Sequence, residues 1–180
     1  ALANDVDDWV RASVAENPVA PEHLLVRLSE DRDESVRSAV AAHPSTPVSV
    51  LDALAKKATG DVKSALAGNP RTSMQFRVPL LKARAKSRKV WDRKSVADDV
   101  DAPASVLEVL SKDSDGWVRH GVATNHVTAS AVLASMSKDK DEDVRKAVAT
   151  NPSTPTSVLD TLARDGSPKV RRAVAGNPFT

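Results

Sequence analysis

Two kinds of side chain in the middle of this sequence could bind a charged or planar ligand. Residues 71–94 hold nine lysines and arginines against one acidic residue, Asp92, which gives the segment a net charge of +8. Trp91 lies in the same segment, and Trp117 follows 26 residues later. Cations beside aromatic rings are typical of surfaces that bind single-stranded nucleic acids, because phosphates pair with the cations and bases stack on the rings. The candidate binding residues are Lys82, Arg84, Lys86, Arg88, Lys89, Trp91, Arg93, Lys94 and Trp117.

The other reactive side chains form no catalytic or metal-binding pattern. The histidines at 23, 43, 120 and 126 lack metal-ligand spacing, and the sequence has no cysteine to supply a disulfide, a thiolate nucleophile or a metal ligand. The six glycines are scattered and form no phosphate-binding loop. We therefore expect no cofactor and no metal, and we predict that the chain is not an enzyme.

An internal repeat positions the candidate residues. The stretch V-R-K-A-V-A-T-N-P-S-T-P that begins at Val144 recurs with small changes, usually every 26 residues. The units start near residues 10, 36, 62, 92, 118, 144 and 170. We expect a single repeat domain over residues 1–180, with an irregular insertion at 80–90 and partial units at both ends, as in a segment of a longer array. Such units bury their apolar faces only by stacking on one another.

Each unit has the pattern of two short helices. In residues 33–57, Asp33 is a predicted N-cap, and Val36 and Val40 lie on one face of the helix that follows. A second apolar helix pattern completes the unit, and no strand pattern is present. The sequence therefore predicts an all-α solenoid built from repeats of about 26 residues.

Prolines mark the helix ends. His43-Pro44, which is Asn-Pro in most units, should end the first helix, because the residue before a proline is pushed out of helical conformations. Thr46-Pro47 should begin the second helix, with the hydroxyl as a cap and the proline at the first helical position.

Two polar ladders follow the repeat. The residue after the first valine is basic, and in four units an aspartate precedes it by four residues, at 7, 33, 115 and 141, which predicts an ion pair on one helix face. The basic residues are Arg11, Arg37, Lys63, Arg93, Arg119, Arg145 and Arg171. They could follow a phosphate backbone, but recurrence in step with the core favours a structural role. The asparagine ladder, which should satisfy backbone groups at helix ends, comprises Asn17, Asn69, Asn125, Asn151 and Asn177, with His43 and Asp99 substituting.

The tryptophans at 9, 91 and 117 precede the opening residue of their units. Trp91 and Trp117 belong to consecutive units, so we expect them to be near neighbours. Packing alone would explain them, and a run of lysines and arginines is more often a solvated face than a binding site. Both interpretations of residues 71–94 therefore stay open.

The pattern V-R-x-A-V-A-x-N-P-x-T-P-x-x-V-L-x-x-L-A resembles the leucine-rich repeat variant family, strongly at 36–55, 144–163 and 170–180 and poorly at 92–110. The resemblance implies a right-handed superhelix of alternating helices, one of which can be short or 3₁₀. Some members carry a cysteine-rich iron–sulfur domain ahead of the repeats, but this chain has no cysteine to match it. The D-x-x-V-R start also resembles HEAT repeats.

These observations predict a non-enzymatic interaction scaffold whose partner is a protein. Nucleic-acid binding through residues 71–94 and the nearby tryptophans is the alternative. By analogy with HEAT-like DNA glycosylases, a less favoured hypothesis assigns base recognition to Trp91, Asp92, Trp117 and Arg119. No apolar run reaches the ~18 residues of a membrane span, so we expect a cytoplasmic protein with no membrane contact. Open repeat ends could also allow end-to-end self-association.

Overall fold

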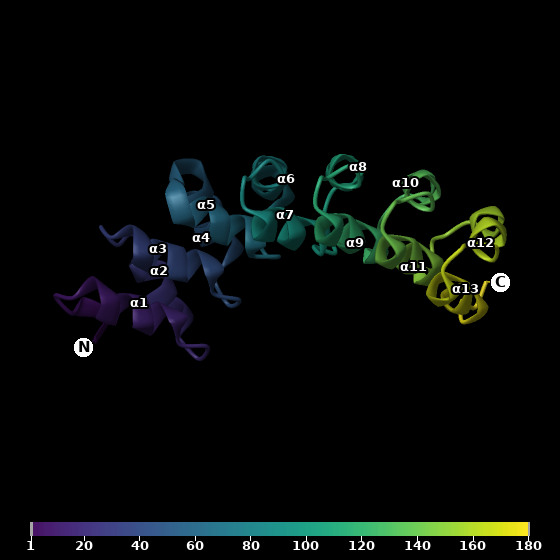
Figure 1. Ribbon diagram of the computed structural model, residues 1–180. Helices are drawn as coiled ribbons and strands as arrows, with labels where there is room; N and C mark the ends of the chain where they lie inside the picture. Colours follow the sequence, from purple (N-terminus) through teal and green to yellow (C-terminus); the bar gives the residue numbers. More distant parts are fainter. Residues whose placement is uncertain (1, 180) are drawn as a thin grey trace. The chain divides into compact units, whose positions relative to one another are not determined.

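The structure is a computed structural model that describes residues 2–179. All the regular elements in this part of the chain are helices (Figure 1), which confirms the predicted all-α fold. A 3₁₀ helix, η1 (Leu2–Asn4), precedes the α-helices. These are α1 (Asp8–Glu16), α2 (Glu22–Leu28), α3 (Glu34–Ala42), α4 (Val48–Lys57), α5 (Gly60–Gly68), α6 (Met74–Arg84), α7 (Val90–Ala97), α8 (Ala104–Leu110), α9 (Gly116–Thr124), α10 (Ser130–Met136), α11 (Glu142–Thr150), α12 (Thr156–Leu162) and α13 (Pro168–Ala175).

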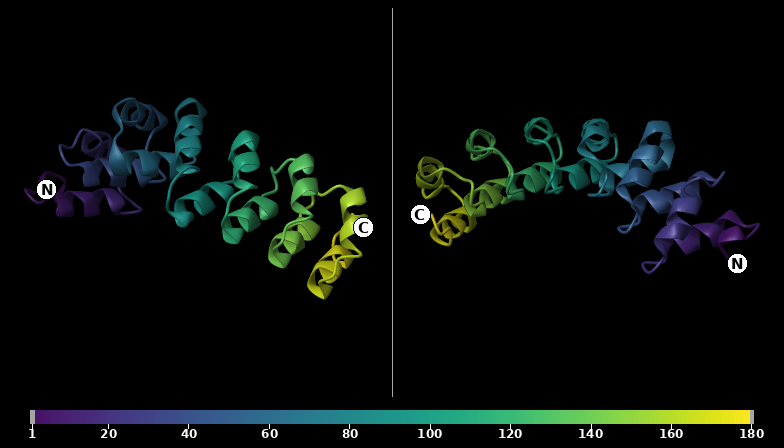
Figure 2. Two further views of the ribbon diagram at one scale, coloured as in Figure 1. Left: turned by 45° about the horizontal axis from the view of Figure 1, so that its top comes forward. Right: turned by 180° about the vertical axis from the view of Figure 1, so that it is seen from behind.

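The chain divides into two compact units, Ala1–Lys82 and Ala83–Thr180. In the first unit, α1, α3 and α5 pack side by side. In the second unit, α7, α9, α11 and α13 do the same, each against the next, and we call them the first-helix layer. The helices α8, α10 and α12 lie on one side of this layer (Figure 1; Figure 2), and each contacts at least one neighbouring helix of the layer. The opposite side of the first-helix layer is therefore left to carry surface residues.

The core consists of the apolar repeat positions. In the second unit, Val118, Val122, Val144 and Val148 from the first-helix layer have no exposed surface. The second helices add leucines at matching positions, which are Leu107, Leu133 and Leu159. Since burying such a side chain contributes ~1.5–3 kcal/mol, stacking of consecutive repeats stabilises helices that are too short to be stable alone.

The first helix of a repeat begins and ends where the sequence predicted. Asp33 is the N-cap of α3, and its Oδ1 accepts a hydrogen bond from the Ser35 backbone N–H at 2.7 Å. The helix ends at Ala42, and His43 adopts an extended conformation before the proline. Both ends thus follow from side-chain chemistry next to the helix.

The second helix begins differently from the prediction. Thr46 does not cap it: the Thr46 Oγ1 hydroxyl donates backwards to the Val40 carbonyl at 2.6 Å. Pro44, which would be the helical partner of that carbonyl, has no N–H to donate. Pro47 is the N-cap and not the first helical residue. The Thr-Pro pair therefore closes the first helix as much as it opens the second.

Residues 80–90, where an irregular insertion was expected, continue α6 and then turn. Helix α6 has 11 residues and contains Pro79, whereas α8 has 7. Residues 85–89 form the turn that leads into α7. The additional residues of this repeat thus lengthen a helix.

Candidate functional site

Four arginines of the ladder bridge consecutive turns. Arg119 Nε donates to Asp139 Oδ2 at 2.7 Å, and Arg119 Nη2 donates to Asp139 Oδ1 at 2.9 Å. Nη1 of the same side chain donates to the carbonyls of Asp113 and Ser114, in the turn before its own helix. The same two-pronged bridge joins Arg11 to Asp31, Arg93 to Asp113 and Arg145 to Asp165. One guanidinium thus ties two successive turns together.

The predicted ion pairs between residues four apart are wrong. Asp115, four residues before Arg119, is the N-cap of α9 and accepts from the Trp117 backbone N–H at 2.8 Å. An N-cap aspartate accepts hydrogen bonds from helix N–H groups. The aspartate in the turn 20 residues after the arginine accepts from both Nε and Nη2 of the guanidinium. The Arg119 and Asp139 side chains are 7% and 10% exposed, so this arginine is not available to phosphates.

The salt bridges lower the pKa of the turn aspartates. The hydrogen bond from Arg11 is the main cause of the lowered pKa of Asp31, and the hydrogen bond from Arg145 is the main cause for Asp165. Partial burial opposes the effect at both carboxyls. The charged form, which the bridge requires, is therefore favoured down to acidic pH.

The asparagine ladder has the structural role that the sequence predicted. Asn151 Nδ2 donates to the carbonyls of Ala123 and Asn125 in the preceding repeat, at 2.8 and 3.0 Å. His43 imitates an asparagine, because Nδ1 accepts from the Ser45 backbone N–H at 3.1 Å and Nε2 lies 3.0 Å from the Asn17 carbonyl. The first bond assigns the proton to Nε2, which can then donate. His43 is thus part of the scaffold, as its place in the asparagine ladder predicted.

Trp91 and Trp117 lie side by side, as predicted, with ring centroids 5.4 Å apart and planes inclined at 43°. Lys94 Nζ lies 5.1 Å from the Trp117 ring centroid and forms an ion pair with Asp98. Trp91 is 65% and Trp117 50% exposed. A Cβ at Gly121 would lie 2.8 Å from Asp98 Oδ1 and 3.2 Å from Lys94 Cδ, so the glycine makes room for this ion pair. The result is an ordered aromatic pair that remains open to solvent.

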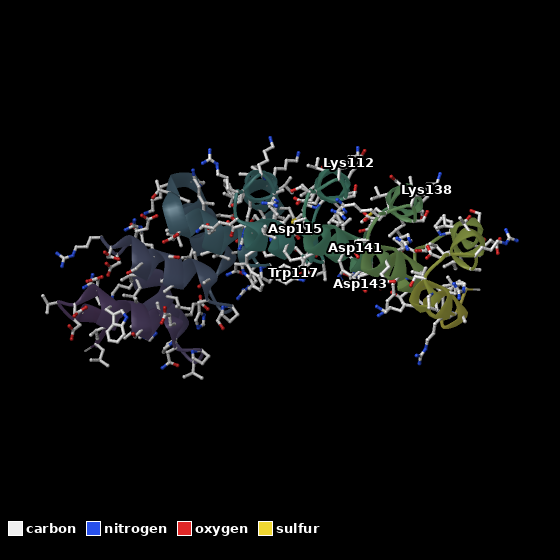
Figure 3. The ribbon with its side chains drawn as sticks, in the orientation of Figure 1. Lys112, Asp115, Trp117, Lys138, Asp141 and Asp143 are labelled. Carbon is white, nitrogen blue, oxygen red and sulfur yellow. The ribbon has the colours of Figure 1, made fainter. Side chains whose placement is uncertain are left out.

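This aromatic pair lies on the free side of the first-helix layer. Figure 3 shows Lys112 and Lys138 on the same side of the layer as α8 and α10. Trp117 and Asp143 lie on the opposite side. Trp117 and Asp143 occupy the same repeat position in consecutive units. That position faces away from the second helices, so residues there can vary without disturbing the core.

The basic segment separates into structural and exposed side chains. Arg93 is bound to Asp113, and Arg84 Nη2 lies 3.6 Å from Asp92 Oδ1. Lys94 is only 8% exposed. The candidate cations that remain exposed are Lys82 on α6 and Lys86, Arg88 and Lys89 in the turn before α7. Of the nine candidate residues, the structure brings Trp91, Trp117 and Lys94 into one cluster.

Two of the residues that the glycosylase hypothesis assigned to base recognition, Asp92 and Arg119, instead form hydrogen bonds with the turns between helices. Asp92 Oδ2 accepts from Ser87 Oγ at 2.7 Å, and Arg119 is bound by Asp139. In residues 2–179, no three His, Asp or Glu side chains gather where a metal ion could be held. No helix of the described chain is long and apolar enough to cross a membrane.

The sequence analysis missed the arginine partners and the residues that fix the tryptophans. The partners Asp31, Asp113, Asp139 and Asp165 share one repeat position, so their recurrence was a readable signal. Asp98 and Gly121 had no such signal, because neither residue type recurs at its repeat position.

The fold and its surface define a helical repeat scaffold. The leucine-rich repeat variant family matches residues 142–167. A solved structure described as a leucine-rich repeat variant with a novel repetitive structural motif is 27% identical, with a TM-score of 0.63, over 97% of this chain and 68% of that chain. An engineered protein of known structure is 18% identical and shares the fold, with a TM-score of 0.52 over 97% of this chain and 65% of its own. No curated protein matches the chain significantly. The predicted resemblance to the leucine-rich repeat variant family is confirmed.

Proposed function

We propose that the chain is a non-enzymatic scaffold that binds a protein partner through the Trp91–Trp117 pair. The observation that carries this proposal is that two large rings pack against each other yet remain 65% and 50% exposed. The core beneath them is complete without them, since Val118 and Val122 are fully buried. Exposed tryptophans contribute more to protein interfaces than most other residues, because they bury a large area and lose little rotamer entropy.

The ion pair beside the rings supports a binding role. Lys94 lies over the Trp117 ring and is anchored by Asp98, which restricts the orientation of the ring. A ring held in place before binding loses less conformational freedom when a partner arrives. A surface with no ligand would gain little from this arrangement.

Panning of a displayed peptide library against the whole chain tests the proposal. Peptides enriched on the wild-type protein should bind a Trp91→Ala/Trp117→Ala variant at least about tenfold more weakly. This corresponds to a loss of about 1.4 kcal/mol in binding free energy. Trp9→Ala is the matched control, because Trp9 has the same repeat position and is 76% exposed but lies in the first unit. Equal binding to all three proteins, or no enriched peptide, would refute the proposal.

A second candidate, single-stranded nucleic acid, rests on the turn that precedes Trp91. Lys86, Arg88 and Lys89 are exposed there, next to a ring on which a base could stack. Three phosphate contacts predict a slope of about −2 for log affinity against log salt. A labelled oligothymidylate should then bind at low salt and lose affinity on Lys86→Glu/Arg88→Glu/Lys89→Glu substitution. Absence of binding at low ionic strength would remove this candidate.

A further inference from the structure

A second surface feature of the first-helix layer is a basic groove between α11 and α13. Its volume is about 340 Å³, and none of its lining residues is acidic. The lining residues are Lys146, Thr150, Lys169, Arg172, Ala173 and Gly176. The groove therefore presents three cationic side chains and one hydroxyl group, and its other lining residues are small.

The repeat provides this groove with a counterpart between α7 and α9. Lys94 and Lys146 occupy the same repeat position, and so do Asp98 and Thr150. In the counterpart, the Asp98 carboxylate binds the Lys94 ammonium. In the α11–α13 groove a threonine replaces that aspartate, so the chain supplies the cation without the carboxylate.

The cations of the groove differ in what they already bind. Lys169 Nζ donates to Glu142 Oε1 at 2.7 Å. Lys146 and Arg172 are both exposed, and neither forms an ion pair within residues 2–179. These two side chains are therefore available to an anion from outside the chain.

We infer that the α11–α13 groove binds a carboxylate of an acidic peptide segment, held by Lys146 and Arg172. The carboxylate takes the place that Asp98 occupies in the counterpart groove. A peptide fits the charge of the surroundings better than a polynucleotide, because a phosphate chain along the layer would pass the exposed carboxylate of Asp143. The inference deepens the proposed function, on which it rests, by naming the chemistry of the protein partner.

Fluorescence anisotropy with a fluorescein-labelled hexaglutamate peptide tests the inference. At about 10 mM salt the Debye length is about 30 Å, so weak ion pairs are measurable. Lys146→Glu/Arg172→Glu should weaken binding at least about tenfold, because two attractions become repulsions. Lys112→Glu/Lys138→Glu, on the side of α8 and α10 (Figure 3), changes the net charge equally and should weaken binding clearly less, because the interaction between charges falls with distance.

A second pair of variants tests the role of the missing carboxylate directly. Thr150→Asp restores the aspartate of the counterpart groove and should weaken hexaglutamate binding about fivefold, since the new carboxylate competes for Lys146. Thr150→Asn changes the shape equally without a charge and should bind as the wild type does. Circular dichroism confirms that each variant is folded.

Three results would overturn the inference. Equal losses for the groove and control double variants would mean that only net charge matters, and equal losses for Thr150→Asp and Thr150→Asn would exclude competition by the carboxylate. Tighter binding of an oligothymidylate than of hexaglutamate, lost on Lys146→Glu/Arg172→Glu, would assign the groove to nucleic acid. Trp91→Ala/Trp117→Ala should leave hexaglutamate binding unchanged, so failure here is distinct from failure of the tryptophan proposal.

Discussion

Removal of one rung of the asparagine ladder should destabilise the chain by a calculable amount. Asn151 is 3% exposed and makes three hydrogen bonds: it donates to Ala123 O and Asn125 O and accepts from Ser153 N–H, at 2.8, 3.0 and 2.8 Å. At about 1 kcal/mol per bond, Asn151→Ala should lower the free energy of unfolding by about 3 kcal/mol, or about 2 kcal/mol if water enters the space. The melting temperature of a domain of this size should fall by about 5–10 °C.

Two further variants separate the ladder from a general effect of the substitution. Asn17 is exposed and accepts one bond, from the Val19 N–H at 3.1 Å, so Asn17→Ala should cost less than about 1 kcal/mol. Asn151→His should recover at least half of the loss, because His43 makes two of the three corresponding contacts at the same repeat position. Urea denaturation followed by circular dichroism measures all three. The reasoning is refuted if Asn151→Ala lies within about 0.5 kcal/mol of the wild type, or if Asn17→Ala costs as much.

Three other predictions follow from the bridges and the tryptophan cluster. Asp139→Asn should cost about 2 kcal/mol in urea denaturation, because it leaves a largely buried guanidinium without its counter-charge, whereas Glu142→Gln, which breaks the exposed pair with Lys169, should cause no measurable change. The folded-state pKa values of Asp31 and Asp165 are lowered, so their stabilisation is present above the unfolded value of about 3.9 and is lost as pH falls through the folded value. The melting temperature should therefore be constant from about pH 7 to 5 and fall below about pH 4, and Arg145→Met should reduce that fall. Gly121→Ala places a Cβ 3.0 Å from Ala97 Cβ and 2.8 Å from Asp98 Oδ1, so it should destabilise the chain by about 1 kcal/mol in spite of the higher helix propensity of alanine, and the Trp117 emission should shift. An unchanged emission spectrum would show that Lys94 and Asp98 do not fix the ring.

The fold could be predicted from the sequence because its determinants are local and recur. Asp33 caps a helix within its own turn, and the proline after His43 ends that helix whatever surrounds it. The apolar spacing of Val36 and Val40 then decides which face is buried. Repetition confirms each of these signals several times in one chain.

The arginine partner was harder to predict because it depends on the stacking distance between turns. Asp115 lies closer in sequence to Arg119 than Asp139 does, and a single helix offers only the nearer one. Stacking brings the turn 20 residues further on within 2.7 Å of the guanidinium and leaves the nearer carboxylate to cap the helix. Long-range geometry of this kind is not contained in helix periodicity.

The candidate site was predictable only in part, for the same reason. The sequence predicted that Trp91 and Trp117 are neighbours, because they occupy the same position in consecutive repeats. It also suggested that the basic residues of 71–94 form one continuous surface. The structure assigns Arg93 to a salt bridge and Lys94 to the face of a ring, so the run has no common role. Charge counted along a sequence does not show which charges are already paired.

The same geometry explains how the surface of a repeat of small helices can vary while the fold is kept. Positions such as those of Val118, Arg119 and Asn125 vary little, because each supplies core packing or a bond to a neighbouring repeat. The positions of Trp117 and Thr150 lie outside the core, and the chain places an aromatic ring, a serine, an acid or a lysine at the first of them in different units. Because each of these positions recurs once per repeat and is exposed, a substitution there changes the surface chemistry and leaves the buried core intact. The surface chemistry of this chain therefore depends on the differences between repeats, and stability depends on what they share.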